Sequence, residues 1–198
     1  MSMMLPLPSE AQIRWRRLDA LGHEIARIER LPSGWCLSGD VVVDTGGVAA
    51  KLRYAVECDA AWHTRSAIIE DASEHHAFHL TLFADGSGHW THGGQPLPQL
   101  DGTLDVDLSF TPATNTLPIR RLSLRVGMSA SVSSVWVRFP DLRIERLEQT
   151  YTREMENTYR YRALVDGETF VARLDTDAFG RVLNYEGLWV AEATSLSR

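Results

Sequence analysis

The stretch LDVDLSFTPATNTLPIRRLSLRV, from Leu104 to Val126, decides how the rest of the chain is interpreted. Its first seven residues alternate strictly between apolar side chains and the polar Asp105, Asp107 and Ser109. Its last six residues alternate again, with arginine or serine between leucine and valine side chains. Alternation of this kind is typical of strands with one apolar and one polar face. The stretch therefore predicts two paired strands joined by a loop rich in Thr, Pro and Asn.

The same alternation recurs along most of the chain, between turn signals such as Leu31-Pro32-Ser33-Gly34 and Asp85-Gly86-Ser87-Gly88. The segment LRIERLEQTYTRE, which starts at Leu142, also has helical propensity, but the alternation at its end favours a strand. Residues 93–101 contain two prolines and are expected to form a loop. Besides the two central strands, the strands expected are 12–18, 23–30, 35–43, 51–58, 62–69, 78–84, 89–92, 128–139, 142–152, 158–165, 170–175 and 181–190.

These segments predict an all-β protein with little helix. A sheet with so many strands cannot remain flat, because strand twist accumulates and makes it curl or close. We therefore expect a long antiparallel sheet coiled into an open or partly closed barrel, whose concave side encloses a hollow. The alternative is a barrel whose interior is filled by side chains. No linker divides the sequence, so residues 1–198 are expected to form a single β domain, with 1–10 as a loose lead-in.

Composition and charge exclude several classes of protein. The hydrophobic fraction of 44% and the charged fraction of 23% are ordinary for a globular chain, and the net charge of −6 argues against a nucleic-acid partner. No window approaches the roughly 18 apolar residues of a membrane span, so no integral membrane segment is expected. The first ten residues lack the features of a signal peptide, which favours a cytoplasmic location with Cys36 and Cys58 reduced. The oligomeric state is left open.

Motifs for cofactors, metals and nucleophilic catalysis are absent from the sequence. It contains no G-x-S-x-G, G-x-G-x-x-G or phosphate-binding loop motif. The histidines at positions 75, 76, 79, 89 and 92 could gather at a hairpin, but their spacing matches no zinc signature. We therefore expect no cofactor and no metal, with these histidines in a solvated loop and hairpin.

The supply of Trp, Tyr, Arg and Asp on several strands indicates an amphiphilic concave face. A Trp ring can stack on a sugar, and an Arg can bind a hydroxyl or phosphate group. The structural alternative is a half-buried Trp in a plain sheet with a solvated outer face. The candidate ligand-binding residues are Trp62, Arg65, Asp105, Asp107, Asn115, Arg120, Arg121, Gln149, Tyr151, Arg153, Tyr159 and Tyr161.

The two aspartates of the central stretch also suggest an enzymatic alternative. Asp105 and Asp107 are two residues apart on one strand face, so their backbones lie about 6.5–7 Å apart, near the carboxyl separation of inverting glycosidases. Such an enzyme would act on a sugar- or lipid-containing substrate, with Arg120 or Arg121 as a charge clamp. The structural interpretation is cross-strand pairing of these carboxylates with Arg121 and Arg125. We assign no catalytic residues, and a third hypothesis is a module that pairs through an exposed sheet edge.

Several segments together resemble one known family, the putative glycolipid-binding proteins, formerly a domain of unknown function. The resemblance implies a bacterial protein with a long antiparallel sheet coiled into an open barrel, similar to lipoprotein-carrier folds. It also implies a non-catalytic protein that holds a glycolipid or another amphiphilic lipid, such as an acyl chain, in the concave face. The segments that carry it are WRRLD (15–19), CDAAWHTRSA (58–67), DVDLSFTPATNTLPIRRLSLRVG (105–127), VRFPDLRIERLEQTYTR (137–153), YRYRA (159–163) and LNYEGLW (183–189).

Overall fold

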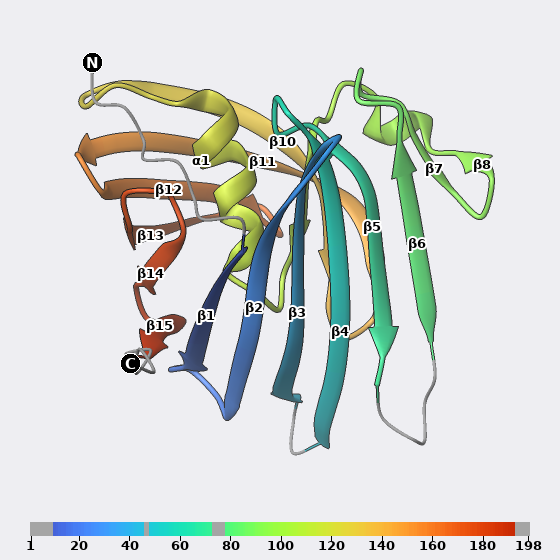
Figure 1. Cartoon of the computed structure of the whole chain (residues 1–198), viewed down its shortest axis with the longest axis horizontal. Coiled ribbons are helices and arrows are strands. Elements are labelled where there is room, and N and C mark those ends of the chain that lie inside the picture. The colour runs from blue at the N-terminus through green and yellow to red at the C-terminus, as the bar shows by residue number, and fades with distance from the viewer. Residues whose placement is uncertain (1–9, 46–47, 73–77, 193–198) are drawn as a thin grey trace.

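Figure 1 shows the computed structural model of the chain, which describes residues 10–45, 48–72 and 78–192. The helical segments are short: η1 (Pro98–Leu100), η2 (Ala113–Asn115) and α1 (Thr116–Leu122). The strands are β1 (Glu10–Arg17), β2 (Gly22–Leu31), β3 (Gly34–Thr45), β4 (Val48–Asp59), β5 (Thr64–Asp71), β6 (His79–Ala84), β7 (Trp90–His92), β8 (Gln95–Pro96), β9 (Asp105–Leu108), β10 (Ser129–Arg138), β11 (Arg143–Met155), β12 (Thr158–Val165), β13 (Glu168–Thr176), β14 (Val182–Tyr185) and β15 (Trp189–Glu192).

All fifteen strands belong to one sheet, in the order β8-β7-β6-β5-β4-β3-β2-β1-β15-β14-β13-β12-β11-β10-β9. The chain forms one meander from β1 to β8 and a second from β10 to β15, and the first and last strands pair in the middle of the sheet. Every pairing is antiparallel except that of β9 with β10, which is parallel. The parallel edge arises because β9 reaches β10 through η2 and α1 rather than through a hairpin.

The sheet is strongly curled and not closed, as predicted for a long antiparallel sheet coiled into an open or partly closed barrel. In Figure 1, β1–β6 run in front and β10–β13 cross behind them, with α1 between the two halves. The segment before β9 touches the opposite half, where the backbone N–H of Thr64 donates to the carbonyl oxygen of Leu104 at 2.9 Å. The concave side is therefore covered by α1 and β9, which form part of the core.

The predicted alternation of faces is confirmed in most strands. On β4, Leu52, Tyr54 and Val56 are almost fully buried, whereas Arg53 and Glu57 are exposed on the other face. This division results from the two-residue period of a strand, which sends successive side chains to opposite faces. The segment from Leu142 onward, for which helix and strand propensities competed, is the strand β11.

The second half of the Leu104–Val126 stretch is not the predicted strand. Residues 116–122 form α1, and Ser123 ends it in the left-handed region at φ 42°. Pro118, expected in the loop, lies in the first turn of the helix, where a residue without a backbone N–H is tolerated. Arg121 and Leu122 of the predicted strand end the helix, and residues 123–126 form no strand. Val126, which the alternation placed on an apolar face, is 54% exposed in the loop before β10.

The first half of the stretch contains the strand β9, but its polar face is solvated only in part, because Asp105 is buried while Asp107 is partly exposed and Ser109 is exposed. Asp105 is 0% exposed, and Val106 and Leu108 on the opposite face are also buried. Both faces are covered because β9 is the strand that closes over the concave side of the sheet. A charged side chain on β9 therefore enters the interior and needs a partner there.

Three smaller predictions also needed correction. Trp62 is not on a strand, because it lies in the turn between β4 and β5 with φ 69°. The predicted strand 181–190 is two strands, β14 and β15, separated by a turn that contains Gly187 at φ 75°. The predicted loop 93–101 includes the short strand β8 and the helical turn η1.

Gly39 on β3 provides a test of the close packing of the inner face. A Cβ atom at this position would lie 2.5 Å from Cε1 of Tyr54, whose buried ring crosses β3 at that point. We expect Gly39→Ala to lower the free energy of unfolding by about 1–3 kcal/mol, because the ring must move within a packed core. Urea denaturation measures the change. Ser38→Ala, at the adjacent outward position, should leave the stability within about 0.5 kcal/mol of the original.

Candidate functional site

The candidate site is a cavity of about 170 Å³ on the concave side, which we call the inner cavity. It lies between β9 with its following loop and the inner faces of β10–β15. Its rim includes the partly exposed Trp136, Val165, Phe170 and Leu188. The residues that line it are Asp107, Leu108, Ser109, Thr111, Asn115, Trp136, Leu147, Tyr161, Ala163, Val165, Phe170, Tyr185, Leu188 and Trp189.

Aromatic rings form much of the cavity wall. The Tyr161 ring centroid lies 5.1 Å from that of Tyr151, 5.9 Å from that of Tyr185 and 6.2 Å from that of Phe170. These residues occupy inward positions on β11, β12, β13 and β14, so the alternation of four neighbouring strands brings them together. Tilted and edge-on arrangements at such distances are favourable and leave ring faces available for a ligand.

A hydrogen-bonded network supports the polar side of the inner cavity. The Nε2 of Gln149 donates to Oδ2 of Asp107 at 2.6 Å and to the hydroxyl of Tyr161 at 2.9 Å. Ser134 donates to Oε1 of the same amide at 2.7 Å, which fixes its orientation. A fourth hydrogen bond, of 2.8 Å, runs from the Tyr151 hydroxyl to Oδ1 of Asn115. These bonds hold Asp107, Asn115 and Tyr161 in position at the cavity surface.

The network joins the partly exposed carboxylate of Asp107 to the buried phenols of Tyr151, Tyr161 and Tyr185. Burial raises the pKa of Asp107 to about 6, the hydrogen bond from Gln149 opposes this shift, and the charge of Asp105 adds to it. Burial likewise raises the pKa of Tyr151, Tyr161 and Tyr185, so these phenols remain protonated at neutral pH. Asp107 is then the group of this network that changes charge near pH 6.

Of the candidate residues from the sequence, Asp107, Asn115 and Tyr161 line the inner cavity, and Gln149 and Tyr151 hold them from behind. The structure brings these five together from β9, η2, β11 and β12. The sequence reasoning missed the other aromatic lining residues, Trp136, Phe170, Tyr185 and Trp189. Their inward alternation was visible, but nothing in the sequence showed that β10 and β13–β15 face one hollow.

Asp105 and Arg121 form a separate buried ion pair. Arg121 donates from Nε to Oδ1 of Asp105 at 3.0 Å and from a terminal nitrogen to Oδ2 at 2.5 Å. The predicted pairing of these two residues is present, but Arg121 comes from α1 and not from a neighbouring strand. Asp107 hydrogen-bonds the neutral Gln149 instead of an arginine. The two aspartates are therefore engaged with different partners, and only Asp107 lines the inner cavity.

Trp62 and Arg120 belong to a cluster with Trp35 and Phe179 that we call the aromatic–arginine cluster. The Trp62 ring stacks on Trp35 with centroids 5.0 Å apart, and Phe179 lies edge-on to both. The Arg120 guanidinium lies 4.2 Å from the Phe179 ring centroid and 5.2 Å from that of Trp62. Trp62 is only 5% exposed, so its ring packs between the β3–β5 side and the loop before β14.

The remaining candidates lie away from the inner cavity. Arg65 binds the Asp59 carboxylate at 3.0 Å and the backbone oxygen of Asp85. Arg153 is 4% exposed and donates to backbone oxygens, including that of Leu124 at 2.7 Å. The Arg153 guanidinium lies 5.7 Å from the Tyr159 ring centroid. In the described contacts these arginines join loops and strand ends to the sheet.

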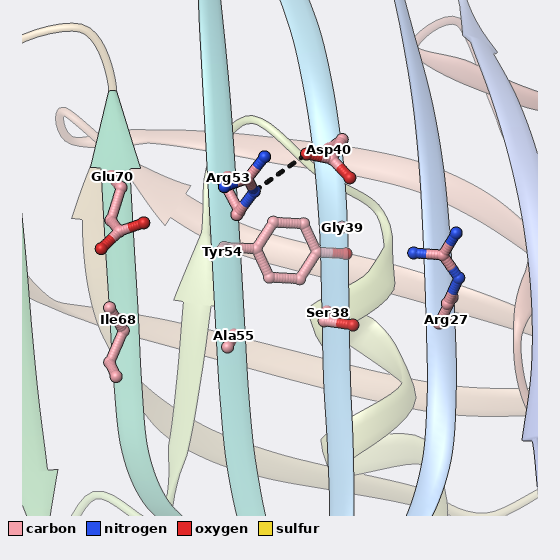
Figure 2. A pocket seen from close by; sticks show the side chains of 9 residues that line it. All are labelled: Arg27, Ser38, Gly39, Asp40, Arg53, Tyr54, Ala55, Ile68 and Glu70. Carbon is pink, nitrogen blue, oxygen red and sulfur yellow. Dashed lines mark hydrogen bonds and ion pairs between the residues drawn. The ribbon is translucent and has the colours of Figure 1, made fainter. Parts of the chain in front are cut away.

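A second hollow of about 360 Å³ lies on the outer face of β2–β5, as Figure 2 shows. Its surface carries Arg27, Asp40, Arg53 and Glu70 around Ala55 and Ile68, and Arg53 donates to Asp40 at 3.1 Å across it. The Tyr54 ring forms its floor where it passes beneath Gly39. The Arg53 and Asp40 side chains are exposed and bind each other, and no aromatic ring other than that of Tyr54 lines this hollow among the described residues.

The histidines and cysteines in the described part of the chain do not form a metal site or an activated nucleophile. His75 and His76 lie outside the described residues. Elsewhere in the described ranges, no three His, Cys, Asp or Glu side chains come together in a way that could hold a metal ion. Burial raises the pKa of Cys36 to about 11 and that of Cys58 to about 12, which disfavours the reactive thiolates.

The fold and the inner cavity define a class of protein: an open, curled β-sheet that presents a small, aromatic, partly polar cavity on its concave side. The sequence profile of a family described as "Putative glycolipid-binding" matches residues 12–191, and the chain belongs to this family. A crystal structure of a DUF1089 family protein from Pseudomonas aeruginosa is similar, with 36% sequence identity and a TM-score of 0.76. The match covers 84% of this chain and 90% of that one. No curated protein matches the chain.

Within the described residues, no helix has the length and apolar character needed to cross a membrane.

Proposed function

We propose that the protein is a non-catalytic binding protein that holds the polar end of a glycolipid or a similar amphiphile in the inner cavity. The observation that carries this proposal is that the inner cavity has aromatic walls and also contains three polar groups held in place by hydrogen bonds, those of Asp107, Asn115 and Tyr161. Ligand sites are typically apolar hollows with a few placed polar groups, and the inner cavity has this composition. The family description supports the same class of ligand.

The size of the inner cavity limits which part of an amphiphile it can hold. Its volume of about 170 Å³ is below the roughly 300–1,000 Å³ of pockets for drug-sized ligands. One ring-sized head group is therefore the natural occupant. The partly exposed Trp136, Val165, Phe170 and Leu188 at the rim offer apolar surface along which an acyl chain would leave the cavity.

The geometry favours binding over the alternative of a glycosidase that uses the Asp105 and Asp107 pair. A two-carboxylate mechanism needs both groups at the scissile bond. Asp105 is 0% exposed and is held by two hydrogen bonds from Arg121, so it has no surface to offer a substrate. Only one of the two carboxylates, that of Asp107, lines the inner cavity.

The proposal is tested by replacing a small residue in the cavity wall with a larger one, which reduces the volume of the inner cavity. Ala163 lies between Gln149 and Phe170 in the sheet register, and Ala163→Leu would extend a larger side chain into the cavity. We expect the affinity for a short-chain alkyl glucoside, measured by calorimetry or by intrinsic tryptophan fluorescence, to fall at least tenfold. Native mass spectrometry of the gently purified protein would show whether a lipid accompanies it.

Arg162→Leu is the matched control, because it introduces the same side chain on the exposed face of the same strand. It should leave the glucoside affinity unchanged, and the thermal unfolding of both variants shows whether the fold is retained. A folded Ala163→Leu protein that binds the glucoside as tightly as the original would contradict the proposed use of the inner cavity.

A further inference from the structure

The inner cavity contains a single charged side chain among the residues that line it, and that charge is negative. Asp107 is this residue, and no arginine, lysine or histidine lines the cavity. Oδ2 of Asp107 accepts a hydrogen bond from the neutral Gln149, and no ion pair of Asp107 is present among the described residues. The nearest acidic residue on the strand, Asp105, already has its own arginine. Asp107 therefore has no cation to balance its charge.

Five aromatic side chains line the same cavity as this carboxylate. Tyr161, Phe170 and Tyr185 form a mutual cluster with centroids 5.9–6.3 Å apart. Trp136 and Trp189 complete the lining, and each already has an arginine near its ring: Arg138 lies 4.9 Å from the Trp136 centroid and Arg17 lies 5.8 Å from the Trp189 centroid. The faces of aromatic rings carry negative electrostatic potential, and rings grouped in this way attract ammonium groups. The rings and the carboxylate thus favour the same sign of charge in a ligand.

A neutral sugar would leave this charge uncompensated. A sugar hydroxyl could donate a hydrogen bond to Asp107. A carboxylate that a bound ligand shields from water is, however, stabilised far more by an opposite charge than by a neutral donor. Burial raises the pKa of Asp107 to about 6, so the carboxylate is still mostly ionised above pH 7. A ligand that brings a cation into the inner cavity would compensate the negative charge of Asp107.

We propose that the head group held in the inner cavity carries an ammonium group, as an amino sugar does, and that Asp107 and the surrounding aromatic rings select it over a neutral sugar. This inference rests on the proposed function and names its ligand class. Asp107 provides the counter-charge, and the rings of Tyr161, Phe170 and Tyr185 provide cation–π contacts. The side-chain amide of Asn115 and the hydroxyl of Tyr161 bind the hydroxyl groups of the same head group.

The test compares two probes that differ in one group: octyl β-glucoside and octyl 2-amino-2-deoxy-β-glucoside. Dissociation constants are measured by calorimetry at pH 7.5, below the concentration at which either forms micelles. We expect the original protein to bind the amino glycoside at least tenfold more tightly than the glucoside. In Asp107→Asn, which keeps an acceptor for Gln149, the two dissociation constants should agree within about threefold.

Glu57→Gln is the control, because it removes the same charge from the exposed outer face of β4. It should keep the preference for the amino glycoside, which separates the effect of Asp107 from a general attraction of cations to an acidic protein. The same preference in Asp107→Asn would overturn the inference. Equal binding of both probes by the original protein would also overturn it while leaving the proposed function intact. Binding of neither probe would count against the proposed function itself.

Discussion

Arg121→Ala is expected to lower the free energy of unfolding by about 3–5 kcal/mol, because it leaves the carboxylate of Asp105 buried without a counter-charge. Asp105 is 0% exposed, and both of its oxygens accept hydrogen bonds from Arg121. Burial raises the pKa of Asp105 even with this partner, because removing the carboxylate from water disfavours its charged form more than Arg121 favours it. For a chain of this size the expected loss corresponds to a decrease of about 10 °C in the midpoint of thermal unfolding.

Arg125 offers a matched control four residues further along. Its side chain is exposed in the loop after α1, and Arg125→Ala should change the stability by less than about 0.5 kcal/mol. Replacing both partners, Asp105→Leu with Arg121→Met, should recover most of the loss, because no charge is then left buried. Similar stabilities for Arg121→Ala and Arg125→Ala in urea titrations would show that the ion pair is not needed.

Glu24 should make the protein lose stability as the pH rises toward 8. The side chain is 1% exposed, and its Oε1 accepts hydrogen bonds from Tyr54 at 2.6 Å and from Thr111 at 2.8 Å. Its Oε2 has no hydrogen-bond partner among the residues that the structure describes. Burial raises the pKa of Glu24 from its usual value of 4.5 to about 8, and the hydrogen bonds from Tyr54 and Thr111 oppose the shift.

The sign of the effect comes from the protons bound by each state. Between pH 4.5 and pH 8 the folded protein keeps a proton on Glu24 that the unfolded chain has released. The favourable contribution is therefore complete below pH 4.5 and is lost as the pH rises through the folded pKa. Across this window the loss of unfolding free energy is on the order of 4 kcal/mol.

Glu24→Gln isolates this contribution, because the amide stays neutral and still accepts hydrogen bonds from Tyr54 and Thr111. The stability of the variant relative to the original protein should rise steadily from pH 4.5 to pH 8, as measured by urea denaturation at each pH. Glu57→Gln, which removes an exposed carboxylate, should show no such trend. A difference between Glu24→Gln and the original protein that does not vary with pH would rule out a buried, protonated Glu24.

Ionisation of Glu24 is expected to affect the wall of the inner cavity through a shared hydrogen bond. Thr111 lines the cavity and also donates to Glu24, so ionisation of this glutamate would act on a residue of the cavity wall. Tyr54 is held by the same carboxyl group and lies against Gly39. The polar groups of the interior are thus shared between the strand half formed by β1–β6 and the segment that follows β9.

The strands and their faces could be predicted from the sequence because their signal is local. On β12, Tyr159 and Tyr161 alternate with Arg160 and Arg162, and the tyrosines are indeed buried while these arginines are exposed. The period of two residues and the turns between the segments contain all the information that this assignment needs. The curl of the sheet also followed, because twist accumulates with the number of strands.

The candidate site was only partly predictable. The sequence proposed Asp107, Gln149 and Tyr161 as ligand-binding residues without showing which face of the sheet lines a cavity, and it also proposed Trp62 and Arg65. The structure places the first three at the inner cavity and the other two elsewhere. Trp62 is held in a turn by Trp35 and Phe179, residues separated from it by 27 and 117 positions. Such contacts depend on which loops meet in space, and no local pattern records that.

The sequence by itself determined an all-β chain, the alternation of two different faces along most strands and the supply of tyrosine and carboxylate side chains on those strands. Only the tertiary structure decided that residues 116–122 form a helix, that β1 pairs with β15, and that Asp105 is paired while Asp107 is left to the cavity. The physical reason is the distance along the chain over which each feature is determined. Alternation depends on neighbouring residues, whereas burial, charge compensation and cavities depend on contacts between segments that are distant in the sequence.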